Sequence, residues 1–380
     1  MELLDTRTRR RVTVAPGGTV RVYVCGITPY DTSHLGHAFV YIIFDVLVRY
    51  IEHLGRRVRY VRNITDVDDD ILRKAHELGI DYLELARREV EQFDQDLARL
   101  GLRRPDASPH ATATIPAIVQ AIRSLVSLRS AYALTDGRVY FDTRAADGFG
   151  ALSRLDRDEM LRQFAEKGGD PGAPGKRDPL DFLLWQPSAE GEPAWPSDWG
   201  AGRPGWHIEC SVMAMEELGS VIDVHGGGSD LVFPHHEAEI LQSEHLTGQR
   251  PFARIWAHVG MVGLGGVKMS KSLGNLVLVS DLLQQFEPDA VRRYLLSHHY
   301  RQAWDYQEAA LRDAAFALER WWEAAGMQGV RTDLEVAFTR AMADDLDIPR
   351  AISVLDQAAR AGAGETLRRL SSVLGFHLIR

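Results

Sequence analysis

The chain has 380 residues, of which 45% are hydrophobic and 26% are charged, and its formal net charge is −9. This composition is typical of a globular protein with two or three domains, and the negative charge argues against a broad nucleic-acid-binding surface, although it is compatible with a local basic groove. No apolar run approaches the ~20 residues of a membrane-spanning helix, and the N-terminus lacks the apolar core of a signal peptide. We therefore expect a cytoplasmic protein with no membrane partner.

The first part of the chain alternates between strand and helix patterns. Residues 19–24 alternate apolar and polar side chains and predict a strand, whereas residues 38–54 carry apolar side chains at helical spacing up to Gly55. Residues 56–65 repeat the strand pattern, and an acidic turn then leads into a helix. This order of elements predicts a parallel sheet covered by helices.

The middle of the chain interrupts that pattern. Residues 81–143 combine two amphipathic helical runs with the strand-like segment RVYFDT, and we expect them to form an insertion. Residues 168–204 are rich in Gly, Pro, Asp and Trp and show little periodicity. They predict a long ordered loop, and such loops in compact domains are usually functional.

The last part of the chain returns to the sheet and then becomes helical. Residues 220–262 show a strand, a helix and a strand, and residues 289–380 are almost wholly helical. The expected fold is therefore α/β: a doubly wound domain over residues 1–288, interrupted by the insertion at about 81–143, and an all-helical C-terminal domain over residues 289–380.

One short loop joins a cysteine to a pair of histidines. Residues 24–38, VCGITPYDTSHLGHA, place Cys25 at the end of the first strand and His34 and His37 near the start of the first helix. Backbone N–H groups and the helix dipole favour bound phosphate at such a helix start. Taken alone, the same residues are also compatible with a polar loop that contains two histidines.

The two cysteines, Cys25 and Cys210, are candidate metal ligands. In a reducing compartment, two cysteines favour the interpretation as metal ligands or buried thiols over that as a disulfide. His235 and Glu239 are four residues apart, on one helical face, and with the two thiolates they form a set that holds zinc tetrahedrally. Zinc binds a substrate thiolate far better than an alcohol. Buried thiols and a solvated helix start are the alternatives, because no pair has the short spacing of a metal motif.

Two further segments have the composition of a nucleotide site. Lys268 and Lys271 lie in the segment GLGGVKMSKSLGN, where two lysines can stabilise the negative charge of a leaving pyrophosphate. Residues 226–230, GGGSD, follow a predicted strand, so their glycines allow close backbone approach and Asp230 can hold ribose hydroxyls. Taken separately, the lysine segment is also compatible with an exposed basic loop, and the glycine run is also compatible with a simple turn.

Together, the HLGH and KMSKS segments resemble the paired motifs of the class I aminoacyl-tRNA synthetase catalytic core. Two families in that class, cysteinyl-tRNA synthetase and the mycothiol-pathway cysteine ligase, are similar to this chain over almost its whole length. The segments that carry the resemblance are CGITPYDTSHLGHA, NITDVDDDIL, KRDPLDFLLW, GRPGWHIEC and HGGGSDLVFPHHEAEI. The resemblance implies a Rossmann-type core that makes cysteinyl-adenylate. The families differ in the acceptor, which is tRNA-Cys in one and the amine of glucosaminyl-inositol in the other.

Residue differences within several short motifs favour the ligase family. CGIT and HLGH differ from the usual synthetase forms, and FAEKGGDP is similar to the ERGGDP segment of the ligases, with Lys167 in place of arginine. Residues 301–380 contain ten arginines, no lysine and twelve acidic residues, a poor composition for neutralising phosphates. PHHEAEILQSE, in contrast, keeps the synthetase form. Charging of tRNA-Cys by a synthetase with a shortened C-terminal domain therefore stays the alternative.

The resemblance also implies roles for individual residues. Zinc would be bound by Cys25, Cys210 and His235, with Glu239 as a fourth or outer ligand. His34 and His37 would contact the ATP phosphates, and Lys268 and Lys271 would stabilise the leaving pyrophosphate. The adenylate pocket would be lined by Cys25, Gly26, Ile27, Thr28, Asn63, Ile64, Thr65, Trp206, Gly228, Ser229, Asp230 and Val262.

The implied cofactors are one Zn²⁺ per chain and Mg²⁺ bound with ATP, whose phosphates need a divalent partner. The implied substrates are ATP, L-cysteine and glucosaminyl-inositol, with tRNA-Cys only under the alternative. We expect the protein to be a monomer.

Overall fold

The computed structural model describes residues 1–14, 17–30, 33–269 and 274–378. Its strands are β1 (Glu2–Asp5), β2 (Arg10–Thr13), β3 (Val20–Ile27), β4 (Val58–Ile64), β5 (Ala131–Ala133), β6 (Val139–Phe141), β7 (Leu183–Pro187), β8 (Gly202–Pro204), β9 (Ile222–Gly228), β10 (Ala253–Val259), β11 (Val262–Leu264), β12 (Val267–Lys268) and β13 (Trp304–Asp305). Its α-helices are α1 (Leu35–His53), α2 (Asp69–Leu78), α3 (Tyr82–Arg99), α4 (Ala111–Ser127), α5 (Arg157–Glu166), α6 (Trp206–Leu218), α7 (Glu237–Thr247), α8 (Val279–Gln285), α9 (Pro288–Leu296), α10 (Glu308–Ala325), α11 (Thr332–Ala343), α12 (Ile348–Arg360) and α13 (Gly364–Val373). Short helical turns are η1 (Thr143–Ala145), η2 (Ser229–Leu231) and η3 (Val232–His236).

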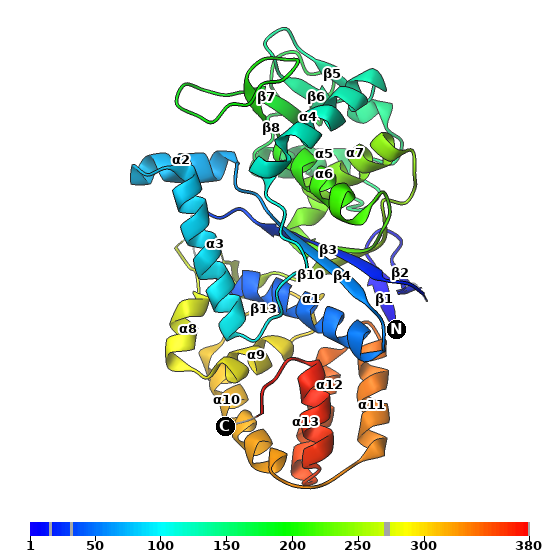
Figure 1. The fold of residues 1–380 in the computed structure, drawn as a ribbon, viewed down its shortest axis with the longest axis vertical. Helices are drawn as coiled ribbons and strands as arrows, with labels where there is room; N and C mark the ends of the chain where they lie inside the picture. The colour runs from blue at the N-terminus through cyan, green and yellow to red at the C-terminus, as the bar shows by residue number, and fades with distance from the viewer. Residues whose placement is uncertain (15–16, 31–32, 270–273, 379–380) are drawn as a thin grey trace.

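A four-stranded parallel sheet in the order β10-β9-β3-β4 forms the centre of the molecule. Most residues of β3 and all residues of β9 are buried, as in a parallel sheet that is covered on both faces. Helices α6 and α7 lie above the sheet and α1 lies below it (Figure 1). The parallel sheet covered by helices, predicted from the sequence, is therefore confirmed.

Two glycines let these layers approach each other closely. A Cβ on Gly26 would overlap the backbone carbonyl of Asn63 on the neighbouring strand, and a Cβ on Gly226 would overlap the Phe44 ring of α1. The glycines in the CGIT and HGGG segments thus bring the strand ends and the first helix together. Both contacts lie near the carboxyl ends of the central strands, where sites form in α/β folds.

A second sheet, with the antiparallel order β5-β6-β7-β8, lies above the central sheet. It has a separate core that contains Phe141, Phe182 and Trp185. The prediction of a long loop over residues 168–204 is wrong, because this segment contains β7 and β8. These strands have five and three residues, too short for a period to emerge among prolines and glycines.

The predicted insertion at residues 81–143 supplies β5 and β6 to this upper sheet, whereas its first helix, α3, packs on the central domain. The Phe93 ring of α3 contacts the Tyr41 ring of α1, with ring centroids 5.2 Å apart. The exact extent of the insertion and the division at residue 288 stay predictions.

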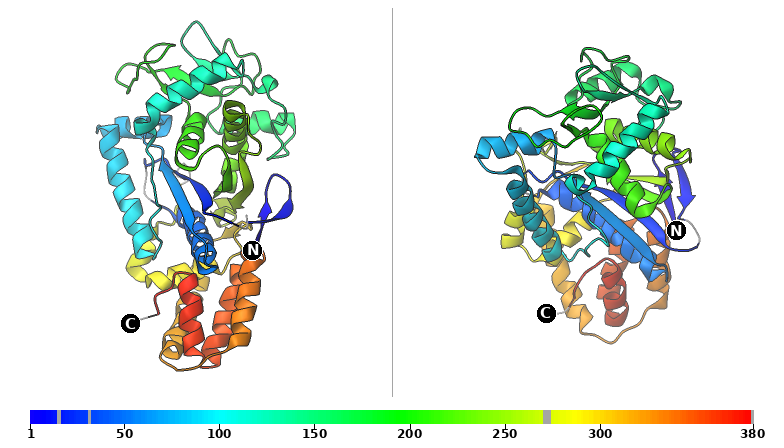
Figure 2. Two further views of the ribbon diagram at one scale, coloured as in Figure 1. Left: turned by 45° about the vertical axis from the view of Figure 1, so that its right-hand side comes forward. Right: turned by 45° about the horizontal axis from the view of Figure 1, so that its top comes forward.

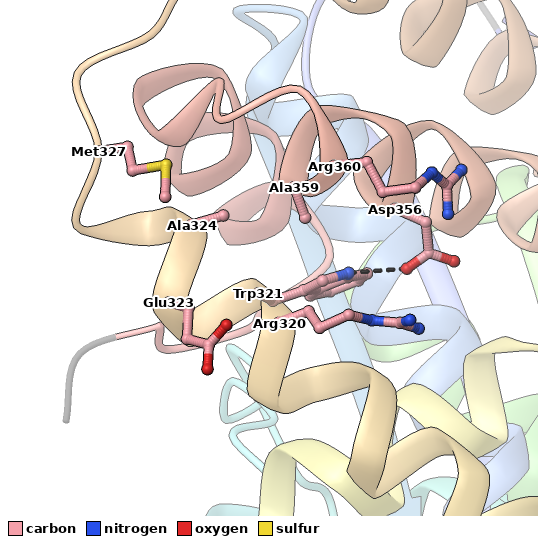
Figure 3. A pocket seen from close by; sticks show the side chains of 8 residues that line it. All are labelled: Arg320, Trp321, Glu323, Ala324, Met327, Asp356, Ala359 and Arg360. Atoms are coloured by element: carbon pink, nitrogen blue, oxygen red, sulfur yellow. Dashed lines mark hydrogen bonds between the residues drawn. The ribbon is translucent and has the colours of Figure 1, made fainter.

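Helices α9 to α13 form the opposite end of the molecule, below α1 (Figure 2). The helical prediction for this region is confirmed, except that the two-residue strand β13 pairs with β11, which precedes the helical region in the chain. A hollow of about 170 Å³ lies between α10 and α12 (Figure 3). On its wall the Trp321 Nε1–H donates to Asp356 at 2.7 Å. Among the described residues, no helix is long and apolar enough to cross a membrane.

Candidate active site and metal centre

Four buried side chains from four elements converge above the central sheet. Cys25 comes from β3, Cys210 from α6, His235 from η3 and Glu239 from α7. One ligand atom of each lies within 4.8 Å of the others, and the four residues are between 0% and 4% exposed. The structure thus brings together all four residues that the sequence predicted as metal ligands.

His235 has one ring nitrogen engaged and one that faces the cluster. Its Nδ1 lies 2.9 Å from Nδ1 of His207, while its Nε2 has no hydrogen-bond partner among the described residues and lies 3.9 Å from Oε2 of Glu239. The Trp206 ring stacks on His235 at a centroid distance of 4.2 Å and holds its plane. With Nδ1–H donating to His207, the Nε2 lone pair is presented to the cluster, as in a histidine that binds a metal.

Burial pushes the cluster toward its neutral protonation states. Burial, reinforced by the neighbouring Cys210, raises the pKa of the Cys25 thiol, and burial also raises the pKa of Glu239. The same desolvation lowers the pKa of His235. A divalent cation favours the opposite states for thiols and carboxylates, because it supplies the charge that buried anions lack. The donor set and the unpartnered Nε2 of His235 therefore fit a metal ion.

A second, overlapping set was not predicted. His225 and His236 join Cys25 and Glu239 in another group whose ligand atoms lie within 4.8 Å of one another. Nε2 of His236 is 3.4 Å from Sγ of Cys25, and Nε2 of His225 is 3.3 Å from Oε1 of Glu239. On its other side, Nδ1 of His236 lies 2.7 Å from Nε2 of His258.

Burial lowers the pKa of both His225 and His258 to about 3, and that of His207 to about 4, so these imidazoles are neutral at physiological pH. The sequence contained one signal for the histidines that it did not predict as ligands. His207, His225 and His236 each stand within three residues of a predicted ligand or of the glycine run. Periodicity carried no such signal, because an isolated histidine in a strand or helix resembles an ordinary core position.

The HLGH segment begins α1, as predicted. His34 is the N-cap residue, and its Nδ1 accepts a hydrogen bond from the Gly36 N–H at 3.1 Å. The His34 and His37 rings stack with centroids 3.9 Å apart. The buried Leu35 between them anchors the turn through its N–H, which donates to the Val277 carbonyl. Both imidazoles therefore lie at the positive end of the α1 dipole.

The second predicted catalytic pair is only partly described. Lys268 belongs by its backbone to β12, and its side chain is outside the described part of the structure. Lys271 lies outside the described residues altogether. Their roles stay predictions.

The two strand ends predicted to line the adenylate pocket are tied to each other. The Gly26 N–H donates to Oδ1 of Asn63 at 2.8 Å, the Asn63 side-chain amide donates to Oγ1 of Thr65 at 3.2 Å, and the Thr65 N–H donates to the Ile27 carbonyl at 3.0 Å. Ile64 pairs with Ile27 across the sheet. These bonds make one rigid rim at the carboxyl ends of β3 and β4.

The remaining predicted pocket residues lie outside this set of hydrogen bonds. Gly228 ends β9, and Ser229 and Asp230 form the turn η2 directly after it, whereas Thr28 follows β3. Val262 belongs to the separate sheet of β12, β11 and β13, where it pairs with Trp304. Their contacts with an adenylate stay predictions.

A cavity of about 610 Å³ lies between residues 189–193 and α2, which follows the rim residue Thr65 in the chain. Its wall includes the carboxylates of Asp69, Asp81, Glu190 and Glu192 together with the basic side chains of Arg73 and His76. Arg203 contacts both Asp69 and Glu192 and so ties α2 to the loop. The cavity adjoins the N-cap residue of α2, Asp68, whose pKa is raised to about 6 by burial and by the neighbouring carboxylates.

Comparison with known proteins gives the family. Residues 12–316 match the family described as tRNA synthetases class I (C) catalytic domain. The chain is 48% identical over 367 residues to the L-cysteine:1D-myo-inositol 2-amino-2-deoxy-alpha-D-glucopyranoside ligase of Thermobifida fusca, with 95% of this chain and 89% of the relative covered. The ligase of the same name from Mycolicibacterium vanbaalenii is 46% identical, with 94% and 84% covered.

The chain belongs to this family of cysteine ligases within the class I synthetases. The fold agrees with the assignment. Mycobacterium tuberculosis methionyl-tRNA synthetase in complex with methionyl-adenylate aligns with a TM-score of 0.64 at 18% identity, covering 94% of this chain and 90% of that one. A leucyl-tRNA synthetase from Agrobacterium radiobacter K84 aligns with a TM-score of 0.67 at 12% identity, covering 95% and 83%. The predicted class I synthetase core is therefore confirmed, and charging of tRNA-Cys is not favoured.

Proposed function

We propose that this ligase-family protein activates L-cysteine with ATP and transfers the cysteinyl group to the amine of glucosaminyl-inositol. The observation that carries the proposal is the buried cluster of Cys25, Cys210, His235 and Glu239, in which Cys25 belongs to β3, the strand that precedes the His34 and His37 helix start. Relatives that are 45% to 48% identical are named for a reaction between cysteine and an aminoglucosyl inositol. A site built from thiols is well suited to select a thiol substrate.

In this proposal the cluster holds zinc. Cys25, Cys210 and His235 would hold the ion. When bound there, zinc would favour coordination of a substrate thiolate over that of a serine hydroxyl. Glu239 is the fourth or outer ligand, and its second oxygen stays oriented by the nearby His225 at 3.3 Å.

The first step forms cysteinyl-adenylate. A carboxylate oxygen of cysteine attacks the α-phosphorus of ATP, the bond to the bridging oxygen breaks, and pyrophosphate leaves. Because no covalent enzyme intermediate is needed, positioning and charge stabilisation dominate the catalysis. His34 and His37 bind phosphate oxygens at the start of α1, Lys268 and Lys271 stabilise the pyrophosphate, and Mg²⁺ accompanies ATP.

The second step forms an amide. The uncharged acceptor amine attacks the carbonyl carbon of the mixed anhydride, AMP leaves with the electrons of the acyl–oxygen bond, and the nitrogen loses a proton to water. The Asp230 carboxylate and the turn of Gly228 and Ser229 hold the ribose during both steps, and the rim of Gly26, Asn63 and Thr65 holds the aminoacyl part with Trp206.

The charge near the site supports an amine acceptor over tRNA. The cavity beside α2 is lined by four carboxylates and one arginine, Arg73, so that its wall keeps a negative charge even with Arg203 paired to two of the carboxylates, and this charge attracts an ammonium group and repels phosphates. The C-terminal helices likewise lack an excess of basic residues. A cytoplasmic location and a monomeric state complete the proposal, and both rest on the sequence alone.

The test measures AMP formation by the purified protein with ATP, Mg²⁺ and cysteine. Glucosaminyl-inositol and deacylated tRNA are offered in parallel, and serine replaces cysteine in a control. We expect turnover with the aminosugar and cysteine, with an amide product of the corresponding mass. Turnover only with tRNA would refute the proposed acceptor, and equal turnover with serine would refute the role of the cluster.

A further inference from the structure

Lys167, a lysine outside the predicted site, contacts the turn that contains Asp230 and Phe233. The Lys167 Nζ donates to the carbonyl oxygen of Asp230 at 2.8 Å and to that of Phe233 at 2.5 Å. It also lies 3.3 Å from Oε1 of Gln163, one helical turn back on α5. Lys167 belongs to the EKGGDP segment, which the proposed reaction does not otherwise use. We propose that Lys167 is a positioning residue that fixes the turn between Asp230 and His235.

The turn needs such support because regular helix bonding fails within it. Residues 229–236 run from the end of β9 into α7 through η2 and the π-helical turn η3. Inside η3, Phe233 has the extended angles φ −135° and ψ 135°. A carbonyl in extended conformation at a helix start has no place in the helical ladder, and Phe233 is 1% exposed. The Lys167 ammonium supplies a donor to that buried carbonyl.

The EKGGDP segment is built to deliver this ammonium. Lys167 is the C-cap residue of α5, and Gly168 reverses the chain with φ +87°. A Cβ on Gly169 would overlap the ring of the buried Phe164. The Gly169 N–H donates to the Phe164 carbonyl at 2.8 Å. The two glycines thus close the end of α5 tightly, and the lysine side chain extends toward η3, against which α5 packs.

The position of the turn matters to both halves of the site. Asp230, the expected ribose ligand, stands at its start, and the predicted metal ligand His235 stands near its end. An ammonium group has three donors, and oxygen atoms of α5, η2 and η3 are among the acceptors around it. Bonds from a charged donor are stronger than neutral ones and fix their acceptors more firmly. Lys167 thereby sets the position of His235 relative to Cys25 and of Asp230 relative to β9.

The inference rests on the proposed function for the roles of Asp230 and His235, and its test therefore uses two readouts. The first is the rate at which a chromogenic chelator withdraws zinc from the zinc-loaded full chain. The second is the KM for ATP, separately from kcat, in cysteine-dependent pyrophosphate exchange. We expect Lys167→Met to speed zinc release about 10-fold and to raise the KM for ATP about 10-fold, in the range found for residues that orient metal ligands.

Two variants separate positioning from general loss of stability. Lys167→Arg keeps a cationic donor in reach and should return both values to within about 3-fold of the wild type. Lys176→Met is the matched control: Lys176 donates to the carbonyls of Asp170 and Pro179 at 2.8 and 2.6 Å in the same part of the chain, yet those bonds do not reach the turn. It should leave zinc release and the KM for ATP unchanged.

Three outcomes would overturn the inference: wild-type zinc release and KM in Lys167→Met, equal changes in Lys176→Met, or no rescue by arginine. If Lys167→Met does not fold, Gln163→Met removes one acceptor and should change zinc release about 3-fold in the same direction. A wild-type protein that binds zinc but exchanges no pyrophosphate would refute the proposed function. The zinc-release comparison would still decide the role of Lys167.

Discussion

Two of the buried polar clusters in the described part of the chain differ in how far their polar atoms are hydrogen-bonded. Below the sheet, Arg292 is 0% exposed and donates to the Asp45 carboxylate at 2.5 Å and to the carbonyls of Leu374 and Leu100 at 2.6 and 2.9 Å. Asp45 in turn accepts bonds from Arg49 on the same helix. This cluster joins α1, α9 and the C-terminal segment with its charges paired.

The cluster above the sheet is equally buried but incomplete. Nε2 of His235 and Nδ1 of His225 have no hydrogen-bond partner in the described part of the chain. Burial raises the pKa values of Cys25 and Glu239, so both groups lack a charge partner strong enough to ionise them. Buried polar atoms are nearly always satisfied, and exceptions call for an explanation. The comparison indicates that the Arg292 cluster holds the fold and that the Cys25 cluster needs a ligand.

Removal of a ligand from the upper cluster should give the largest effect. Cys210→Ala should bind about one tenth of the wild-type zinc or less and lose cysteine-dependent pyrophosphate exchange, because three donors hold zinc far more weakly than four. Metal analysis and exchange assays check both. Ser211→Ala is the control: Ser211 follows Cys210 on α6 and hydrogen-bonds to Gln242 at 2.6 Å, outside the cluster. Full zinc occupancy in Cys210→Ala would show that the thiol is not a ligand.

Arg292→Met should have the opposite profile. It leaves Asp45 as a buried charge with fewer partners, so the free energy of unfolding should fall by about 3 to 5 kcal/mol, measured by urea denaturation. Zinc content should stay at the wild-type level. Arg162→Met, which removes ion pairs of a side chain that is 61% exposed, should leave the free energy of unfolding close to the wild-type value. Loss of zinc from Arg292→Met at temperatures where the variant is folded would show that the two clusters are not independent.

The third effect is intermediate, because it changes the orientation of a ligand and not the ligand itself. His207→Ala removes the partner of Nδ1 of His235, which lies 2.9 Å away, and should weaken zinc binding about 10- to 100-fold without abolishing it. Zinc competition with a chelator measures the change. His245→Ala serves as control, since His245 pairs with Ser130 at 2.7 Å and not with the cluster. Unchanged affinity in His207→Ala would remove His207 from the support of the site.

The sequence predicted the elements that carry strong local patterns. The strand, helix and strand of β3, α1 and β4 follow from alternation, helical spacing and Gly55, and the start of α1 follows from HLGH. The four candidate ligands were found because thiols are rare in this chain and because His235 and Glu239 share a helical spacing. Local composition suffices where a few residues decide the structure.

The remaining features depend on distant parts of the chain. His225 reaches the cluster because β9 pairs between β3 and β10, a register that no local pattern contains. Strands β7 and β8 are stabilised by each other and by β6, so their short segments looked like loop. Lys167 meets the Asp230 turn across 63 residues of sequence. Such contacts arise from tertiary packing and are visible only in the structure.

The smallest effect concerns an ion pair in which Asp66 is buried and its partner, His110, is partly exposed. Nδ1 of His110 is 2.9 Å from Oδ2 of Asp66, and the hydrogen bond to Asp66, opposed by burial, raises the pKa of His110. A raised pKa stabilises the fold fully below the ordinary histidine pKa of about 6.5, and this contribution disappears as the pH rises through the raised value. Because the His110 side chain is 44% exposed, water screens the pair and the contribution is about 0.5 kcal/mol.

His110→Gln should therefore be less stable than the wild type by about 0.5 kcal/mol at pH 5.5, and the difference should shrink toward zero by pH 8.5. Urea denaturation at both pH values measures it, and zinc content should not change. A difference that grows with pH would mean that the neutral imidazole is the stabilising form. Charge pairing would then matter only where the partners are fully buried, as in the Arg292 cluster.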